Sequence, residues 1–168
     1  ILSSDQQVLE KGFINLDFGY DKTSITLFEN SKLIFSKSIP IGSFHINNDL
    51  MKSIDLDKNL SERIKCNYDK ILNGTVDNSI KSELEKRKIS LDIIKKIVDA
   101  RIDETLDYIY KNISFCRAFN TSARKIILTG GGADLQLFQK KIKEKLKTTV
   151  DFAKQSFPIK NTEFKDCL

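Results

Sequence analysis

The feature that most constrains the fold is a short apolar strand that runs directly into three glycines. Residues 125–129 read KIILT, Gly130, Gly131 and Gly132 follow, and a helix is predicted to begin near Asp134. Glycine has no Cβ, so this turn permits positive φ angles and a close approach to the backbone. The following helix offers unpaired N–H groups to a ligand. A nucleotide is the natural candidate, and a tight connection without a ligand is the alternative.

A second candidate site lies near the start of the chain, in a predicted hairpin. Apolar residues alternate with polar ones over residues 14–18 and 25–27, and a third strand is predicted at 33–39. Asp17 falls at the mouth of this hairpin. A carboxylate there can hold Mg²⁺ or its water shell, while free N–H groups of the turn hold phosphate oxygens. The alternative is an aspartate that only caps its own turn.

The two sites together resemble the second half of the actin-like ATPase superfamily, in order and in spacing. Residues 17–19 with Thr23 resemble the second phosphate loop of that family, and residues 128–134 resemble its adenosine loop. Between them, residues 60–65 (LSERIK) are similar to the helix whose Glu and Lys reach the ribose and base in bacterial actins. The resemblance implies ATP held between two lobes together with Mg²⁺.

The resemblance also assigns a role to each matching residue. It places Asp17 on the metal through water, Glu62 and Lys65 on the ribose, and the three glycines at 130–132 on the adenosine. It assigns the binding of the phosphates to five residues of the turn: Gly19, Tyr20, Asp21, Lys22 and Thr23. The family usually has glycines and small hydroxyl residues in this turn, so we expect slow hydrolysis at most. No catalytic residue is assigned.

Within the superfamily, the chain is identified as a member of the FtsA family of bacterial cell-division proteins. Residues 36–50 are similar to the FtsA pattern in which a strand ends at Ile-Pro and a Gly turn opens a helix. Residues 99–104 resemble the long helix before the adenosine strand. Membership implies a cytoplasmic protein, peripheral on the inner face of the cell membrane, that polymerises and tethers the FtsZ ring. A PilM-type pilus-assembly ATPase and a nucleotide-free interaction module of the same fold are alternatives.

The predicted strands and helices alternate along the 168 residues, which indicates an α/β fold with a small helical insertion. The resemblance implies that this fold is one actin-like (ribonuclease H-like) ATPase lobe, a mixed sheet flanked by helices. By resemblance, residues 1–54 and 96–168 form subdomain IIA with the start of the return to domain I. Residues 55–95 form the insertion, which resembles subdomain IIB. Both ends are expected to be cuts, and residues 161–168 resemble the opening of the last family helix. The N-terminal phosphate loop and the C-terminal membrane helix would then lie outside this chain.

Helices are predicted over residues 47–54, 59–69, 79–88, 90–113 and 135–147, and a strand over 148–152. In the longest helix, Ser90 is expected to cap the N-terminus. Its apolar residues recur near the 3.6-residue period and are expected to be core: Ile94, Val98, Ile102, Leu106, Ile109 and Ile113.

The net charge of +5 is spread and mixed in sign, which indicates a solubilised surface rather than a nucleic-acid site. The helix 135–147 is predicted to pack on the sheet, with a basic membrane-surface helix as the alternative. By resemblance, the insertion receives the C-terminal peptide of FtsZ, and the chain self-associates into filaments and reaches the inner membrane through a missing segment. The basic residues of that region are Lys58, Arg63, Lys65, Lys70, Lys81, Lys86, Arg87 and Lys88.

The three cysteines, Cys66, Cys116 and Cys167, are widely spaced. Their number and spacing favour reduced thiols in a cytosolic chain over a disulfide framework or a zinc site. His45 is the only histidine and has no Ser or Cys partner in a recognisable triad, so we expect it in a loop or at a helix entry.

Overall fold

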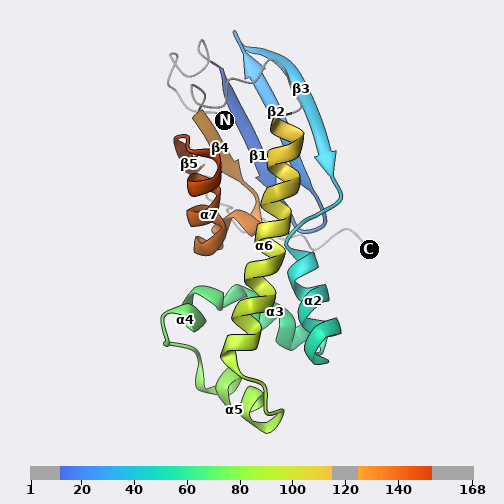
Figure 1. Ribbon diagram of the computed structural model, residues 1–168, viewed down its shortest axis with the longest axis vertical. Helices are drawn as coiled ribbons and strands as arrows, with labels where there is room; N and C mark the ends of the chain where they lie inside the picture. Colours follow the sequence, from blue (N-terminus) through green and yellow to red (C-terminus); the bar gives the residue numbers. More distant parts are fainter. Residues whose placement is uncertain (1–11, 115–124, 153–168) are drawn as a thin grey trace, which may run out of the picture.

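A computed structural model describes residues 12–114 and 125–152, and shows a sheet at one end and short helices at the other (Figure 1). One long helix, α6 (Leu91–Ser114), runs along both parts. The stretch at 161–168 that resembles a last family helix lies outside the described residues. Within the described part of the chain, no helix is both long and apolar enough to cross a bilayer.

The described strands form one mixed sheet in the order β3-β2-β1-β4-β5. The first three, β1 (Phe13–Phe18), β2 (Thr23–Glu29) and β3 (Lys32–Ile39), pair antiparallel in chain order. The return strand β4 (Lys125–Thr129) pairs parallel with β1, and β5 (Val150–Phe152) pairs parallel with β4. The predicted α/β arrangement is confirmed, with β3 beginning one residue earlier than expected and β5 two residues later.

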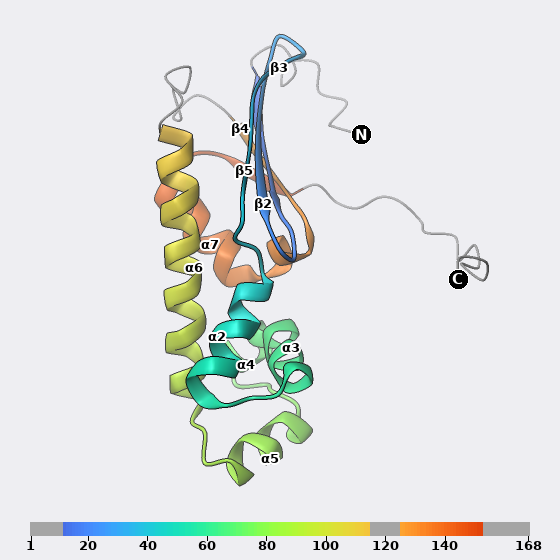
Figure 2. The ribbon, with the colours of Figure 1, turned by 90° about the vertical axis from the view of Figure 1, so that its right-hand side faces the viewer.

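Alternation along the strands builds the core between the sheet and its helices. Ile14, Leu16 and Phe18 of β1 are buried, as the period of two requires. Helices α6 and α7 (Gln136–Leu146) lie on the same side of the sheet (Figure 2). The ring of Phe18 stacks on Phe138 of α7 with centroids 4.3 Å apart. The helix predicted over 135–147 therefore packs on the sheet, as expected.

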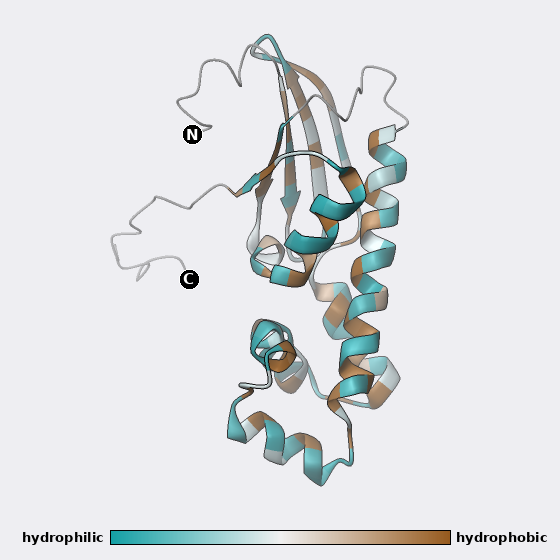
Figure 3. Ribbon diagram, turned by 60° about the vertical axis from the view of Figure 1, so that its left-hand side comes forward, coloured by the Kyte–Doolittle hydropathy of each residue, from teal (hydrophilic) through white to brown (hydrophobic). Residues whose placement is uncertain are grey.

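The predicted apolar stripe of α6 is confirmed. Each of its six members is buried, and in Figure 3 hydrophobic residues recur along this helix between hydrophilic ones. Ser90 Oγ accepts a hydrogen bond from the Ile93 N–H at 3.3 Å, which confirms the predicted cap. Lys141 of α7 forms ion pairs with Asp99 and Asp103 of α6 on the outer side of the contact. The two helices are thus joined by both core packing and surface charge.

Short helices form the other part of the chain: α2 (Phe44–Ile54), α3 (Lys58–Cys66), α4 (Tyr68–Leu72) and α5 (Asn78–Lys86). Their apolar residues are continuous with the core of the sheet. One hydrophobic core therefore serves both parts.

Helix boundaries differ from the sequence prediction where side chains or special backbone angles end a helix. The single helix predicted over 59–69 divides at Asn67, whose side-chain N–H₂ donates to the Arg63 carbonyl at 2.9 Å and competes with the helical pattern. Residue Lys88 has a φ of 55°, so the helix predicted over 79–88 ends earlier. The helix expected near Asp134 begins at Gln136, because the chain first forms a 3-10 turn, η2 (Gly131–Asp134).

Helix α2 begins three residues before the predicted start. The first turn contains His45, whose Nδ1 accepts a hydrogen bond from the Gly42 N–H at 3.2 Å, so the expected helix-entry position is confirmed. Gly42 packs directly on the β1–β2 turn. A Cβ there would lie 2.2 Å from the Tyr20 carbonyl oxygen and 2.7 Å from the Asp21 carbonyl carbon. The entry to α2 therefore requires glycine.

Gly42→Ala should lower the free energy of unfolding by about 2 kcal/mol, because the new methyl group forces backbone apart at the hairpin. Gly131→Ala is the matched control, since a Cβ at Gly131 meets nothing within 4 Å. Urea unfolding followed by circular dichroism measures both variants. Equal midpoints for the two would contradict the close contact at Gly42.

Candidate functional site

The β1–β2 turn is closed on itself and tied to the start of α2. The Gly19 N–H donates to the Lys22 carbonyl at 3.0 Å. The Ser43 N–H donates to the Gly19 carbonyl at 2.9 Å, and the Phe44 N–H donates to the Tyr20 carbonyl at 2.8 Å. The turn that sequence reasoning assigned to phosphates therefore has a backbone held from two sides.

Asp17 lies where this turn meets the glycine loop. Its register partner across the β1–β4 ladder is Thr129, whose hydroxyl donates to Asp17 Oδ1 at 3.2 Å. Gly130 follows with a φ of 92°, and a Cβ there would lie 2.6 Å from the same Oδ1 and 2.5 Å from the Phe18 carbonyl oxygen. The structure thus brings together the two motifs that are most distant in the sequence. Only glycine fits at Gly130, on grounds of both φ and space.

The other residues of the turn differ in what they present. Thr23 is fully buried, and its hydroxyl donates to the Ile41 carbonyl at 2.6 Å, so it joins β2 to the segment before α2. Asp21 and Lys22 are exposed. The Tyr20 ring is half-exposed, with the Lys65 Nζ 5.1 Å from its centroid, a cation–π contact.

The pair predicted to hold the ribose, Glu62 and Lys65, lies on one side of α3. Lys65 is 7% exposed and its Nζ is 2.8 Å from Glu62 Oε2. The Asn47 side-chain N–H₂ donates to the same oxygen, and the Cys66 thiol donates to Oε1 at 3.3 Å. Burial raises the pKa of Glu62, but the hydrogen bonds from Lys65, Asn47 and Cys66 outweigh it and hold that pKa below its ordinary value. Burial and the neighbouring Glu62 raise the pKa of the Cys66 thiol.

These elements enclose a pocket of about 440 Å³, within the size range of ligand sites. It is lined by Tyr20, Ser43, Glu62, Lys65, Cys66, Asp69, Gly131, Gly132, Asp134 and Leu135. Five of these were predicted from the sequence: Tyr20, Glu62, Lys65, Gly131 and Gly132. The other predicted residues are not among its lining residues: Asp17, Gly19, Asp21, Lys22, Thr23 and Gly130.

Sequence reasoning missed part of the lining. Cys66 follows Glu62 at helical spacing and Leu135 comes soon after the three glycines, so spacing alone could have found these two. Asp69 lies on α4, beyond the break at Asn67, where the spacing of α3 no longer applies. No sequence signal pointed to Asn47, a buried residue of α2 whose side-chain N–H₂ donates a hydrogen bond to Glu62.

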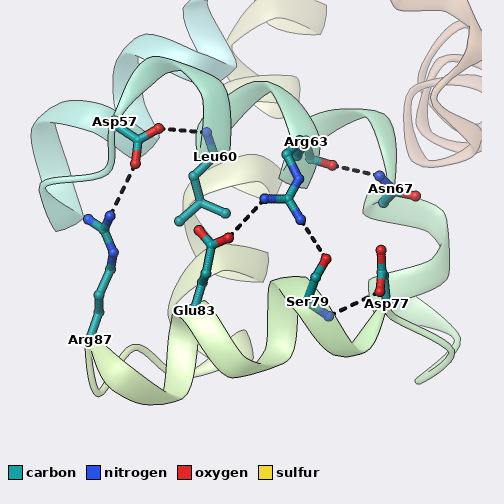
Figure 4. A network of polar contacts seen from close by, with 8 residues as sticks. All are labelled: Asp57, Leu60, Arg63, Asn67, Asp77, Ser79, Glu83 and Arg87. Carbon is teal, nitrogen blue, oxygen red and sulfur yellow. Dashed lines mark hydrogen bonds and ion pairs between the residues drawn. The ribbon is translucent and has the colours of Figure 1, made fainter.

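The far side of α3 contacts α5, a later helix of the same insertion (Figure 4). Arg63 donates to Glu83 Oε1 at 2.9 Å and to Ser79 Oγ at 2.6 Å, both on α5. Arg87 pairs with Asp57 at 3.1 Å. Helix α3 therefore faces the pocket on one side and holds α5 on the other.

No group of three or more His, Cys, Asp or Glu side chains within residues 12–114 and 125–152 could hold a metal ion by itself. A metal ion near Asp17 would take its remaining ligands from water and from phosphate oxygens, which suits Mg²⁺. Cys66 is a free thiol, and the other two cysteines lie outside the described residues.

Solved structures of actin-fold proteins share this architecture. A PilM–PilN type IV pilus biogenesis complex superposes with a TM-score of 0.66 at 16% identity, over 87% of this chain and 36% of that one. MreB 5 of Spiroplasma citri, bound to AMPPNP, superposes with a TM-score of 0.64 at 17% identity, over 89% of this chain and 50% of that one. The fold is therefore that of an actin-like lobe, as the sequence predicted.

The family described as "Cell division protein FtsA" matches residues 14–166. FtsA of Agrobacterium fabrum is 27% identical over 136 residues, which cover 76% of this chain and 31% of that protein. FtsA of Porphyromonas gingivalis is 22% identical over 149 residues, which cover 86% of this chain and 30% of that protein. The chain belongs to the FtsA family, which confirms the resemblance seen in the sequence. It spans about a third of the length of these relatives.

Lys65→Met should raise the pKa of Glu62, because the variant removes a hydrogen-bond donor and a positive charge while burial remains. Carbon-detected NMR titration of the Glu62 carboxyl measures this pKa. In the wild type, the pKa of Glu62 is lowered on folding, so its contribution to stability is lost as the pH falls through the folded-state pKa.

Lys58→Met, on the exposed face of the same helix, is the matched control and should leave the pKa of Glu62 unchanged. An unchanged or lower pKa in Lys65→Met would show that this lysine does not hold Glu62 ionised.

Proposed function

We propose that this chain forms one wall of an ATP site in an FtsA-type cell-division protein, with the nucleotide and Mg²⁺ bound between two actin-like lobes. The observation that carries the proposal is the convergence of three predicted motifs around one pocket. Tyr20 comes from the β1–β2 turn, Glu62 and Lys65 come from α3, and the glycine loop comes from the end of β4. Segments this far apart in sequence have no local reason to meet.

The proposed roles follow from the chemistry of each wall. The ammonium and carboxylate of Lys65 and Glu62 can bind the hydroxyls of a ribose. Gly131 and Gly132 line the pocket without side chains, so an adenosine can lie against their backbone. The proposal assigns the phosphates to the β1–β2 turn, of which Tyr20 lines the pocket, and their Mg²⁺ to Asp17. Bound Mg²⁺ neutralises phosphate charge, and in this proposal hydrolysis is slow.

In the cell, the proposal implies a peripheral protein on the cytoplasmic face of the inner membrane that polymerises and tethers FtsZ. Residues 1–54 and 96–168 would act as subdomain IIA, and residues 55–95, with α3 to α5, as subdomain IIB. Support comes from the family match and from the placement of the sheet at one end and the short helices at the other (Figure 1).

Asp17→Asn should weaken MgATP binding by about tenfold in the full-length protein, because one anionic contact to the metal's water shell is lost. The full-length protein is used because a cleft ligand gains affinity from both walls. Isothermal titration calorimetry with and without Mg²⁺ measures the loss, and thermal melting checks the fold.

Asp55→Asn is the control, since it removes the same charge from an exposed position that does not line the pocket and should not weaken binding. A lower melting temperature with unchanged MgATP affinity in Asp17→Asn would make Asp17 a structural residue of the β1–β4 junction.

The proposed FtsZ-peptide surface is the exposed basic part of α5 and the turn after it. Lys81, Lys86 and Lys88 are exposed, whereas Arg87 is paired with Asp57 and supports the fold. Reversing the three lysines to Glu should weaken binding of the FtsZ C-terminal peptide by about tenfold, since each exposed charge contributes only a fraction of a kcal/mol. Fluorescence anisotropy at low salt measures the affinity, and added salt should weaken the wild-type complex.

Reversal of three other exposed lysines, Lys32 and Lys37 on β3 and Lys52 on α2, makes the same change in net charge and should have a smaller effect. Equal losses for the two sets of variants would mean that the peptide responds to overall charge and not to this surface.

A nucleotide-free interaction module is a second candidate, and Tyr20 is the observation that favours it. Its ring lies against Lys65 and Phe44 beside the turn, where the family usually has a small residue. The titration of the wild-type full-length protein with MgATP separates the two candidates, because the module would bind no nucleotide.

A further inference from the structure

The ring of Tyr20 lies over the most buried charged group that lines the pocket. Lys65 is 7% exposed, and its Nζ is 5.1 Å from the centroid of the Tyr20 ring. Glu62 Oε2 is 2.8 Å from the same nitrogen. The ammonium group therefore contacts a carboxylate and an aromatic ring, and both Tyr20 and Lys65 belong to the wall of the pocket.

The ring leaves no room for a ligand on its side of the ammonium group. A ligand oxygen that accepts a hydrogen bond from Lys65 Nζ must lie about 2.9 Å from it. An oxygen at that distance in the direction of the ring would lie about 2 Å from the ring centroid, whereas non-bonded heavy atoms in contact are about 3.5 Å apart. An ammonium group has three N–H donors, and Glu62 accepts from one of them. A ligand oxygen that uses a donor on this side must take the place of the ring.

The ring can move although the backbone of Tyr20 is held. The Tyr20 carbonyl accepts a hydrogen bond from the Phe44 N–H at 2.8 Å, and the backbone at Gly42 packs directly against it. The ring itself is 45% exposed, so it can turn toward solvent by rotation of the side chain alone. Rotation of exposed side chains is fast, within picoseconds to nanoseconds. Displacing the ring therefore breaks its contacts with Lys65 and Phe44 but leaves the turn intact.

We propose that Tyr20 is a gate over Lys65: its ring covers the ammonium group in the free protein, and a nucleotide displaces the ring when its oxygens bind Lys65. This inference rests on the proposed nucleotide binding in the same pocket. The displaced ring loses a cation–π contact and an aromatic contact. The new hydrogen bonds to a charged donor are stronger than these contacts. The gate thus lowers the affinity for the nucleotide without preventing its binding.

The first test removes the ring and measures MgATP binding to the full-length protein by isothermal titration calorimetry. Tyr20→Ala should bind MgATP about fivefold tighter than the wild type, because no contact of the ring has to be broken. Tyr20→Phe retains the ring and should bind with the wild-type affinity. Partial unfolding of a variant weakens binding, so it does not imitate the expected gain.

Tyr108→Ala is the matched control. The Tyr108 ring on α6 is also 45% exposed, and the Nζ of Lys111 lies 5.9 Å from its centroid, but Tyr108 does not line the pocket. Its removal deletes the same kind of contact at a distant position. The affinity of this variant for MgATP should equal that of the wild type.

The second test measures the cover over Lys65 without any nucleotide. Acetic anhydride labels accessible lysines of the full-length protein, and mass spectrometry compares Lys65 with the exposed Lys70 of the same sample. In Tyr20→Ala, the relative labelling of Lys65 should rise at least about threefold, since the aromatic contact that covers it is gone. Tyr20→Phe should label like the wild type.

The gate would be overturned if Tyr20→Ala bound MgATP no tighter than the wild type, or if Tyr20→Phe showed the same gain as Tyr20→Ala. Unchanged labelling of Lys65 in Tyr20→Ala would overturn it as well. These results would leave nucleotide binding in place. If neither the wild type nor Tyr20→Ala bound MgATP, the proposed function would be overturned together with the gate.

Discussion

The parallel pairing of β1 with β4 is the contact on which the rest of the structure depends. It joins strands more than a hundred residues apart in the chain and places Asp17 opposite Thr129. The next residue, Gly130, must be glycine, because its positive φ and its contact with the β1 backbone leave no room for a Cβ. Both loops at this end of the sheet are positioned by that ladder. A change in register would separate the hairpin turn from the glycine loop and open the pocket.

Helix α3 links the pocket to the rest of the insertion, although it is only nine residues long. One side carries Glu62 and Lys65 into the pocket, and the other side carries Arg63 to α5. Isolated helices of this length are not stable in water, so its position depends on these contacts and on its buried apolar residues. Any movement of α3 would therefore change the pocket wall and the position of α5 together.

The actin-like fold serves many functions, so the fold alone does not decide what this chain does. The family match narrows the class to cell division, and the side chains around the pocket carry the chemical argument. Two features of the pocket matter for that argument. The Tyr20 ring of the β1–β2 turn contacts the Lys65 ammonium, and the Asp69 carboxylate has one oxygen without a hydrogen-bond partner in the described residues. Both features bear on the proposed binding of a nucleotide and not on the folding of the lobe.

The sequence by itself determined the strands, the long helix and the motifs, because alternation, the 3.6-residue period and glycine clusters are local properties of the chain. It also pointed to Glu62 and Lys65, through their resemblance to a known helix. Only the tertiary structure showed that the Thr23 hydroxyl donates a hydrogen bond to the Ile41 carbonyl. It alone also showed that Asn47 and Asp69 belong to the site. These roles depend on which distant backbone or side chain lies opposite, and that is decided by strand order and helix packing, which no local pattern records.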